Sequence, residues 1–202
     1  MPTQTLAKLA TTEAASATID AGGTSPAQVM AVVGAMPPGF VEPVTRPMVY
    51  IGGETEGGAP FYTWNHDEEK KDFVPVNRFS ARLLEIKTII KNPDDELKRA
   101  VKVVLEFETA TGGRVGISCG AKTWSALGIV AGISGMTAEQ LQGEIGLSGK
   151  VGRRGVTFIS CFAEGGLVRN PNAEELLKEA RADDAQIECV EGLVGEIQAK
   201  LS

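Results

Sequence analysis

The chain has 202 residues, a formal net charge of −6, and 43% hydrophobic but only 5% aromatic residues. This length allows one domain of about 100 to 150 residues with flanking segments. The three cysteines lie far apart and cannot all pair, which favours a reducing, cytoplasmic compartment over a secreted disulfide scaffold. The sequence predicts neither a signal peptide nor a membrane-spanning stretch.

The charge is unevenly distributed along the chain. Residues 78–169 contain 13 Lys and Arg against 9 Asp and Glu, a net charge of +4, whereas residues 1–77 and residues 170–202 each carry −5. A local basic surface attracts a polyanion even when the whole molecule is acidic. The alternative is a solvated surface on which the sign of the charge varies by chance.

The first part of the chain predicts little regular structure. Residues 1–45 are rich in Ala, Thr, Gly and Pro, and we expect a flexible arm there. Residues 49–51 then form a short apolar run, and residues 61–64 form an aromatic cluster after a glycine-rich loop. This pattern is typical of a hairpin that leads into the following domain.

Three strands are predicted next. Residues 80–90 form an apolar, β-branched run, which ends at the turn signal of residues 92–95. Apolar and polar residues alternate over 102–108 and again over 114–119, on either side of Gly112 and Gly113. Two alternating runs around a Gly-Gly turn predict a hairpin.

A helix and two further strands follow. The helix is expected over residues 124–133, with Thr123 or Ser125 as its N-cap, and Thr137 with Gln140 predicts a capping box for one more turn. Residues 145–151 and 156–162 are predicted strands. The loop between them has the sequence Gly-Arg-Arg-Gly.

The last segment, residues 170–202, is predicted to be helical, with Asn172 as a cap. Apolar residues spaced by three and four positions form one stripe along it: Ile187, Val190, Val194, Ile197 and Leu201. The stripe must be buried, either against the preceding domain or in a homo-oligomer.

The order of the elements, the basic loop and the acidic residues that follow resemble single-stranded DNA-binding proteins of the OB type, over about residues 73–169. This resemblance implies a mainly β fold with helices: a flexible arm (1–45), a five-stranded OB-like barrel with a leading hairpin (46–169) and a C-terminal helical segment (170–202). It also implies a ligand across the second and third barrel strands, between the loops 91–99 and 152–155.

The candidate contacts are chosen because single-strand binders combine a basic groove with aromatic platforms. Two arginines between glycines predict a flexible basic tip that follows phosphates, although a simple solvated hairpin has the same sequence. The aromatic residues Phe107, Phe158 and Phe162 are expected to fill the barrel instead. The predicted nucleic-acid contacts are Arg153, Arg154, Lys102, Arg114, Lys122, Trp124, Tyr62 and Trp64.

The sequence provides poor support for an enzyme. His66 stands among acidic residues without the spacing of a metal site, and we expect a solvated loop there. The run of residues 146–151 lacks the glycine and the hydroxyl residue that a phosphate loop requires. We expect no catalytic residue, metal or cofactor.

The sequence therefore predicts a protein that binds single-stranded nucleic acid, in the first place DNA, without sequence preference, in replication, recombination or repair. The alternative is a structural or assembly protein of a virus or mobile element, which would use the barrel and the C-terminal helix for protein contacts.

Overall fold

The computed structural model describes residues 46–202, so the predicted arm over residues 1–45 lies outside the described residues. The strands are β1 (Met48–Ile51), β2 (Phe61–Asn65), β3 (Lys70–Val74), β4 (Arg78–Lys91), β5 (Ala100–Glu108), β6 (Arg114–Gly120), β7 (Glu144–Val151), β8 (Thr157–Ala163) and β9 (Gly166–Val168). The helices are α2 (Trp124–Ser134), α3 (Ala138–Gln142), α4 (Pro171–Ala182) and α5 (Gln186–Leu201).

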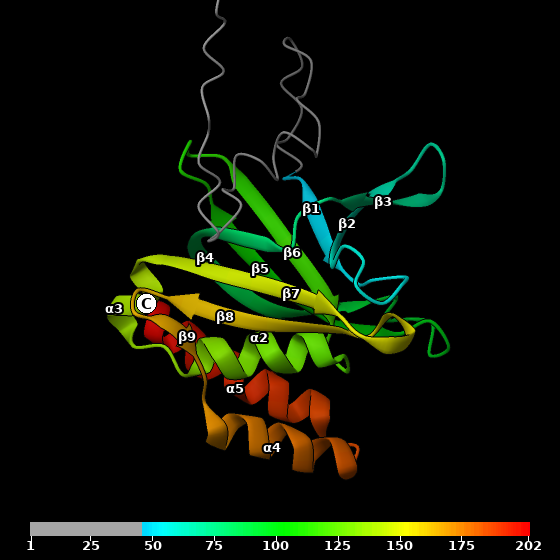
Figure 1. Cartoon of the computed structure of the whole chain (residues 1–202). Coiled ribbons are helices and arrows are strands. Elements are labelled where there is room, and N and C mark those ends of the chain that lie inside the picture. Colours follow the sequence, from blue (N-terminus) through cyan, green and yellow to red (C-terminus); the bar gives the residue numbers. More distant parts are fainter. Residues whose placement is uncertain (1–45) are drawn as a thin grey trace, which may run out of the picture.

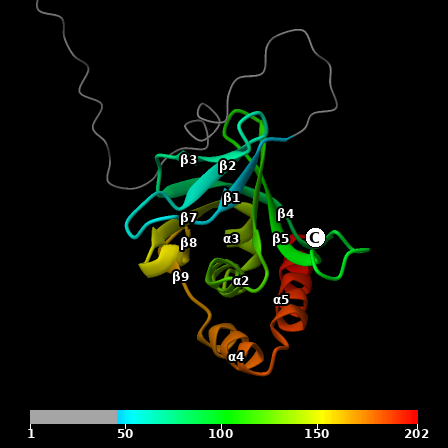
Figure 2. The same ribbon diagram turned by 90° about the vertical axis from the view of Figure 1, so that its right-hand side faces the viewer.

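All nine strands belong to one sheet, in the order β3-β2-β1-β6-β5-β4-β7-β8-β9. Helices α2, α4 and α5 lie on the side of the molecule away from the β2-β3 hairpin (Figures 1 and 2). The predicted order of three strands, a helical region and two strands is present as β4, β5, β6, α2 with α3, β7 and β8. The mainly β fold is confirmed, but the five-stranded closed barrel is wrong, because the sheet has nine strands and does not close.

One obstacle to closure is the leading hairpin. Strand β1 lies parallel to β6, with Met48 opposite Gly116 and Tyr50 opposite Ser118. It thereby occupies the edge of β6 that is not paired with β5, and β2 and β3 extend the sheet further. The hairpin that the sequence predicts only as a lead-in is therefore an integral part of the sheet.

The second obstacle to closure is helix α2, which packs against β8. The Ser125 hydroxyl donates a hydrogen bond to the carbonyl oxygen of Thr157 at 2.8 Å. A Cβ atom on Gly128 would lie 2.2 Å from the carbonyl oxygen of Ile159. Since the helix lies against the β8 backbone at these two carbonyl groups, β7 is the one strand among the described residues that pairs with β8 there, and β9 pairs only with its last residues, 161–163.

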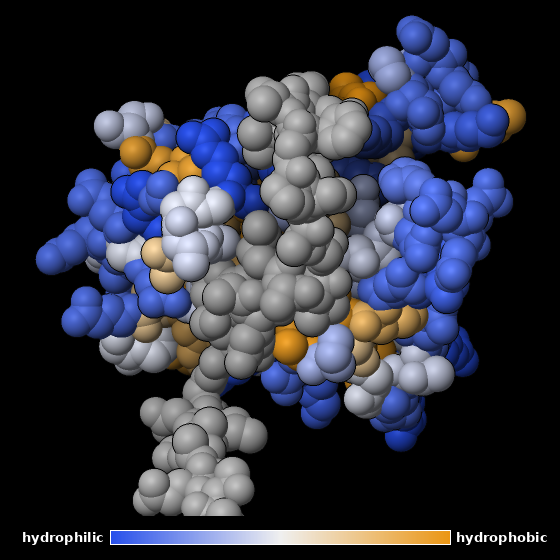
Figure 3. All heavy atoms as spheres, turned by 90° about the horizontal axis from the view of Figure 1, so that it is seen from above, coloured by the Kyte–Doolittle hydropathy of each residue, from blue (hydrophilic) through white to orange (hydrophobic). Residues whose placement is uncertain are grey.

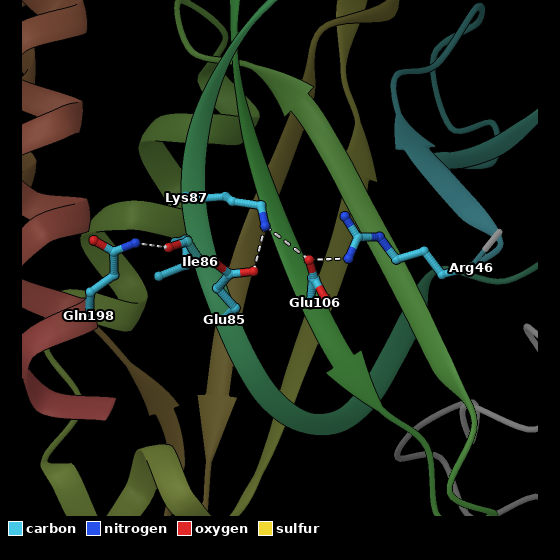
Figure 4. Close-up of polar contacts among 6 residues, drawn as sticks. All are labelled: Arg46, Glu85, Ile86, Lys87, Glu106 and Gln198. Atoms are coloured by element: carbon cyan, nitrogen blue, oxygen red, sulfur yellow. Dashed lines mark hydrogen bonds and ion pairs between the residues drawn. The ribbon is translucent and has the colours of Figure 1, made fainter. Parts of the chain in front are cut away.

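Strand β4 changes neighbours along its 14 residues. Its first part, 78–82, pairs with β7, and residues 82–91 pair with β5, with an irregularity between Leu83 and Glu85. Bulges of this kind bend a strand and increase its twist. Where β7 no longer accompanies β4, the Gln198 side-chain amide of α5 donates a hydrogen bond to the carbonyl oxygen of Ile86 at 2.8 Å (Figure 4).

The predicted core and caps are largely confirmed. Phe107, Cys119 and Cys161 are buried, and burial raises the pKa of each of these two thiols to about 12. Thr123 is the N-cap of α2, and the capping box at the start of α3 is present. These assignments succeed because they depend on local spacing, which the sequence shows directly.

The C-terminal segment contains two helices instead of one, and the cap of the first is Asn170 instead of Asn172. Pro171 occupies the first helical position, where its missing N–H group costs nothing, and this places the cap at Asn170, two residues before the predicted one. Val190, Val194 and Ile197 of the predicted stripe are buried in the core of the molecule. These three residues are therefore covered within the chain. They leave no exposed apolar surface for the alternative, a contact in a homo-oligomer.

A buried carboxylate marks the face of the sheet opposite this core. Glu106 on β5 is 6% exposed and pairs with Arg46 and with Lys87, whose ammonium group lies 3.1 Å away and also 2.6 Å from Glu85 (Figure 4). Burial alone would raise the pKa of Glu106. The hydrogen bonds at its carboxylate and the charges of Arg46 and Lys87 outweigh burial, so the pKa is lowered.

Candidate nucleic-acid interface

Four aromatic residues line one face of the leading hairpin. Tyr62 and Trp64 are two positions apart on β2 and therefore point to the same side, and Tyr62 stands opposite Tyr50 of β1 and Phe73 of β3. Lys71 stands opposite Trp64 and two positions from Phe73. We call this set, together with Lys102 of β5, the strand platform: Tyr50, Tyr62, Trp64, Phe73, Lys71 and Lys102.

Three of the four rings of the strand platform form a ladder. The Tyr50 and Tyr62 rings stack with centroids 5.4 Å apart at 26°, and the Phe73 ring lies 5.8 Å from Tyr62. Burial, and secondly the neighbouring Tyr50, raises the pKa of Tyr62. Trp64 at the outer end is 42% exposed. The platform thus combines a supported inner part with an accessible outer ring.

The two lysines lie directly over these rings. The Lys71 ammonium group is 5.0 Å from the Tyr62 ring centroid, and that of Lys102 is 5.6 Å from the Tyr50 centroid. Within residues 46–202, neither lysine forms an ion pair with a carboxylate. Both ammonium groups are therefore within cation–π range of a ring face.

The Gly-Arg-Arg-Gly loop between β7 and β8 is more ordered than a flexible tip. Residues Arg153–Gly155 form a short 3-10 turn with Arg154 in the left-handed region at φ 58°. A Cβ atom on Gly155 would lie 2.4 Å from the carbonyl oxygen of Gly53, so only glycine allows this close approach of the two loops. Both arginines are exposed at the surface of a docked turn.

The remaining predicted contacts lie in two different places, at the start of α2 and at the far end of β6. Trp124 begins α2 near the β7-β8 loop, and Lys122 forms an ion pair with Asp184 at 2.9 Å. Arg114 lies at the far end of β6, because it stands opposite Glu108 while Lys102 stands opposite Gly120. Six residues of strand, about 20 Å, separate the two positions. The structure therefore brings Lys102 to the Tyr50 ring, which stacks on Tyr62, while Trp64 and Arg114 lie further along the same face of the sheet.

Sequence reasoning missed several members of these groups. Tyr50, Phe73 and Lys71 join the strand platform only through cross-strand pairing, although the alternation within residues 70–74 gives a weak signal. Phe158, which was expected to fill a barrel, is wrong as a core residue because it is 48% exposed. It alternates with the buried Thr157 and Ile159 and so points outward.

No family model, curated protein or solved structure matched this chain in the comparisons with known proteins. Among residues 46–202, no group of three His, Cys, Asp or Glu side chains is placed to hold a metal ion, and His66 lies in the exposed β2-β3 turn. No helix within this range is long and apolar enough to cross a membrane.

Proposed function

We propose that this protein binds single-stranded nucleic acid, without sequence preference, across the strand platform. The observation that carries the proposal is the ladder of Tyr50, Tyr62 and Phe73 with Lys71 and Lys102 over its rings. Stacking on aromatic rings is worth about 1 to 3 kcal/mol per base and tolerates any sequence, because every base has a π face.

The chemistry of the surface fits this ligand. The rings supply stacking surface and the two lysines supply cations, and neither group requires a defined base edge. Seen from above, hydrophilic side chains dominate the right-hand side of the molecule, and apolar surface appears there only as small separate patches (Figure 3). A charged, solvated ligand suits such a surface better than a large apolar protein face does.

A cross-strand aromatic ladder also has a purely structural explanation, because such pairs stabilise hairpins by about 0.2 to 1 kcal/mol each. The two explanations differ in their consequences. If the ladder only supports the hairpin, replacing Tyr62 lowers thermal stability and leaves the binding of oligonucleotides unchanged. If it binds nucleic acid, the same replacement weakens binding.

The test is a fluorescence anisotropy titration with labelled single-stranded DNA, single-stranded RNA and duplex DNA over a range of salt concentrations. We expect single strands to bind more tightly than duplex. The logarithm of the affinity should fall linearly with the logarithm of the salt concentration, by about 0.7 for each phosphate contact. An absence of binding at low salt, or an affinity that salt does not change, would exclude the proposal.

A further inference from the structure

A second aromatic and basic cluster lies at the end of the sheet. The Trp124 ring of α2 and the Phe158 ring of β8 have centroids 6.1 Å apart, and the Arg181 guanidinium group of α4 lies 4.4 Å over the Trp124 ring. Trp124 is 38% exposed and Phe158 is 48% exposed. Two large rings side by side at the surface are unusual in a chain with so few aromatic residues.

The arginine loop borders this cluster. A Cβ atom on Gly152 would lie 3.2 Å from the Phe158 ring, so the turn that carries Arg153 and Arg154 begins beside that ring. Among the described residues, Arg153, Arg154 and Arg181 form no ion pair. Rings with unpaired guanidinium groups around them match a base with its phosphates in both shape and charge.

The cluster is connected to the strand platform. Lys102, which lies over the Tyr50 ring, stands opposite Gly120 at the end of β6. From Gly120 only Ala121, Lys122 and the cap residue Thr123 lead to Trp124. The end of β6 beside Lys102 is therefore joined to the cluster by only three residues of chain.

We propose that Trp124, Phe158, Arg153 and Arg154 form a second nucleotide subsite, which takes the continuation of the same single strand that the platform binds. One base stacks against the exposed ring faces, and the two loop arginines contact the adjoining phosphates. We call these four residues the end subsite. This inference rests on the proposed function and extends it, because it adds a second contact region on the path of the strand.

Asp184 limits the positive charge at the end subsite. Its carboxylate forms an ion pair with the Lys122 ammonium group at 2.9 Å, and both side chains are exposed. A phosphate that approaches Lys122 must replace this carboxylate. Neutralising Asp184 therefore frees a cation next to Trp124 without touching any ring, and we expect tighter binding as a result.

The chain has two tryptophans, one in each region, so each region has its own fluorescent reporter. In Trp124→Phe the signal comes from Trp64 in the platform, and in Trp64→Phe it comes from Trp124 in the end subsite. The probes are oligo-dT of about 4 and about 16 nucleotides, which span the usual site sizes of single-strand binding domains. We expect the long probe to quench both reporters.

Charge variants complete the test. Arg153→Gln with Arg154→Asn removes two cations, and asparagine tolerates the left-handed backbone at position 154. We expect the affinity for the long probe to fall about 5- to 50-fold and its salt slope to fall by about 0.7 for each lost contact, with the short probe changed less than about 2-fold. The matched control removes two distant charges, Arg114→Gln with Arg169→Gln, and should leave this length dependence intact.

Each outcome decides one of the two proposals. If no oligonucleotide binds the full chain, the proposed function fails. If the long probe quenches Trp64 but not Trp124, or the loop variant and the control weaken binding equally, only the end subsite fails. Asp184→Asn provides a second test should the loop variant not fold. It should raise the affinity for the long probe by about 2-fold or more, and an unchanged affinity would count against the end subsite.

Discussion

Gly128 lies in direct contact with the backbone of Ile159, so closely that a Cβ atom at position 128 would stand 2.2 Å from the Ile159 carbonyl oxygen. This contact seats helix α2 against the backbone of β8. The absence of a side chain at position 128 thus allows the helix to pack this closely on the strand.

We expect Gly128→Ala to destabilise the protein by at least about 2 kcal/mol, because the added methyl group meets backbone that cannot rotate away. Chemical denaturation followed by circular dichroism measures this change. The matched control is Gly195→Ala in α5, where nothing lies within 4 Å of the added carbon. It should stabilise the protein by about 0.5 to 1 kcal/mol, and equal effects of the two substitutions would contradict the packing described above.

Glu106→Gln should lower stability at neutral pH by about 1 to 3 kcal/mol, because Arg46 and Lys87 lose a buried anionic partner. The pKa of Glu106 is lower in the folded protein, so its contribution is present above the unfolded value of about 4.3. It is lost as the pH falls through the folded value. Denaturation curves over a pH series should therefore show the wild type and the variant converging in acid.

The control for this experiment is Glu108→Gln, two residues along the same strand. Its ion pair with Arg82 is more exposed, with Glu108 at 36%. We expect a loss below about 1 kcal/mol there. A larger effect at position 108 than at position 106 would show that burial does not govern the strength of these pairs.

Lys200 stabilises the end of a different helix. Its ammonium group donates hydrogen bonds to the carbonyl oxygens of Ser134 at 2.7 Å and Met136 at 3.2 Å, at the C-terminus of α2. Lys200→Met should cost about 0.5 to 2 kcal/mol by thermal denaturation. Lys178→Met, an exposed lysine on α4, should change stability by less than about 0.5 kcal/mol. A similar loss in both variants would argue against a specific cap.

The three thiols should differ in reactivity. Cys119 and Cys161 are buried with pKa values of about 12, whereas Cys189 is only partly buried, although burial and then Glu196 raise its pKa as well. At about pH 8 the native protein should react slowly with a thiol reagent at Cys189 alone, and denatured protein at all three. Mass spectrometry of alkylated peptides identifies the sites, and early labelling of Cys161 would contradict the close contact of α2 with β8.

In the strand platform, Tyr62→Ala should weaken the binding of single-stranded oligonucleotides by about 1 to 3 kcal/mol, because it removes the middle ring of the ladder. Tyr62→Phe retains the ring and should stay within about 2-fold of the wild type, since stacking needs no hydroxyl group. Anisotropy titrations measure both. Circular dichroism confirms that the hairpin remains folded, and equal losses in both variants would contradict stacking.

Much of the secondary structure followed from the sequence. The alternation of apolar and polar residues placed the β5-β6 hairpin, and the Thr137-Gln140 pair placed a helix cap, because both depend on neighbours within a few positions. The cap at Asn170 was missed by two residues, since Asn172 offers the same side chain. Of the candidate site, Tyr62, Trp64, Lys102 and Arg114 share a face, but Arg114 lies six residues of strand away from the end that carries Lys102.

Most of the strands, most of the caps and the apolar stripe of the last helix could be read from the sequence alone, because they are local features, whereas β3 and β9 were not predicted. That the sheet stays open, and that Phe158 lies at the surface beside Trp124, became visible only in the folded structure. The physical reason is that these outcomes depend on contacts between distant segments: β1 occupies the edge of β6, and Gly128 admits α2 to the backbone of β8. A glycine looks the same in a sequence whether it breaks a helix or lets one approach a strand.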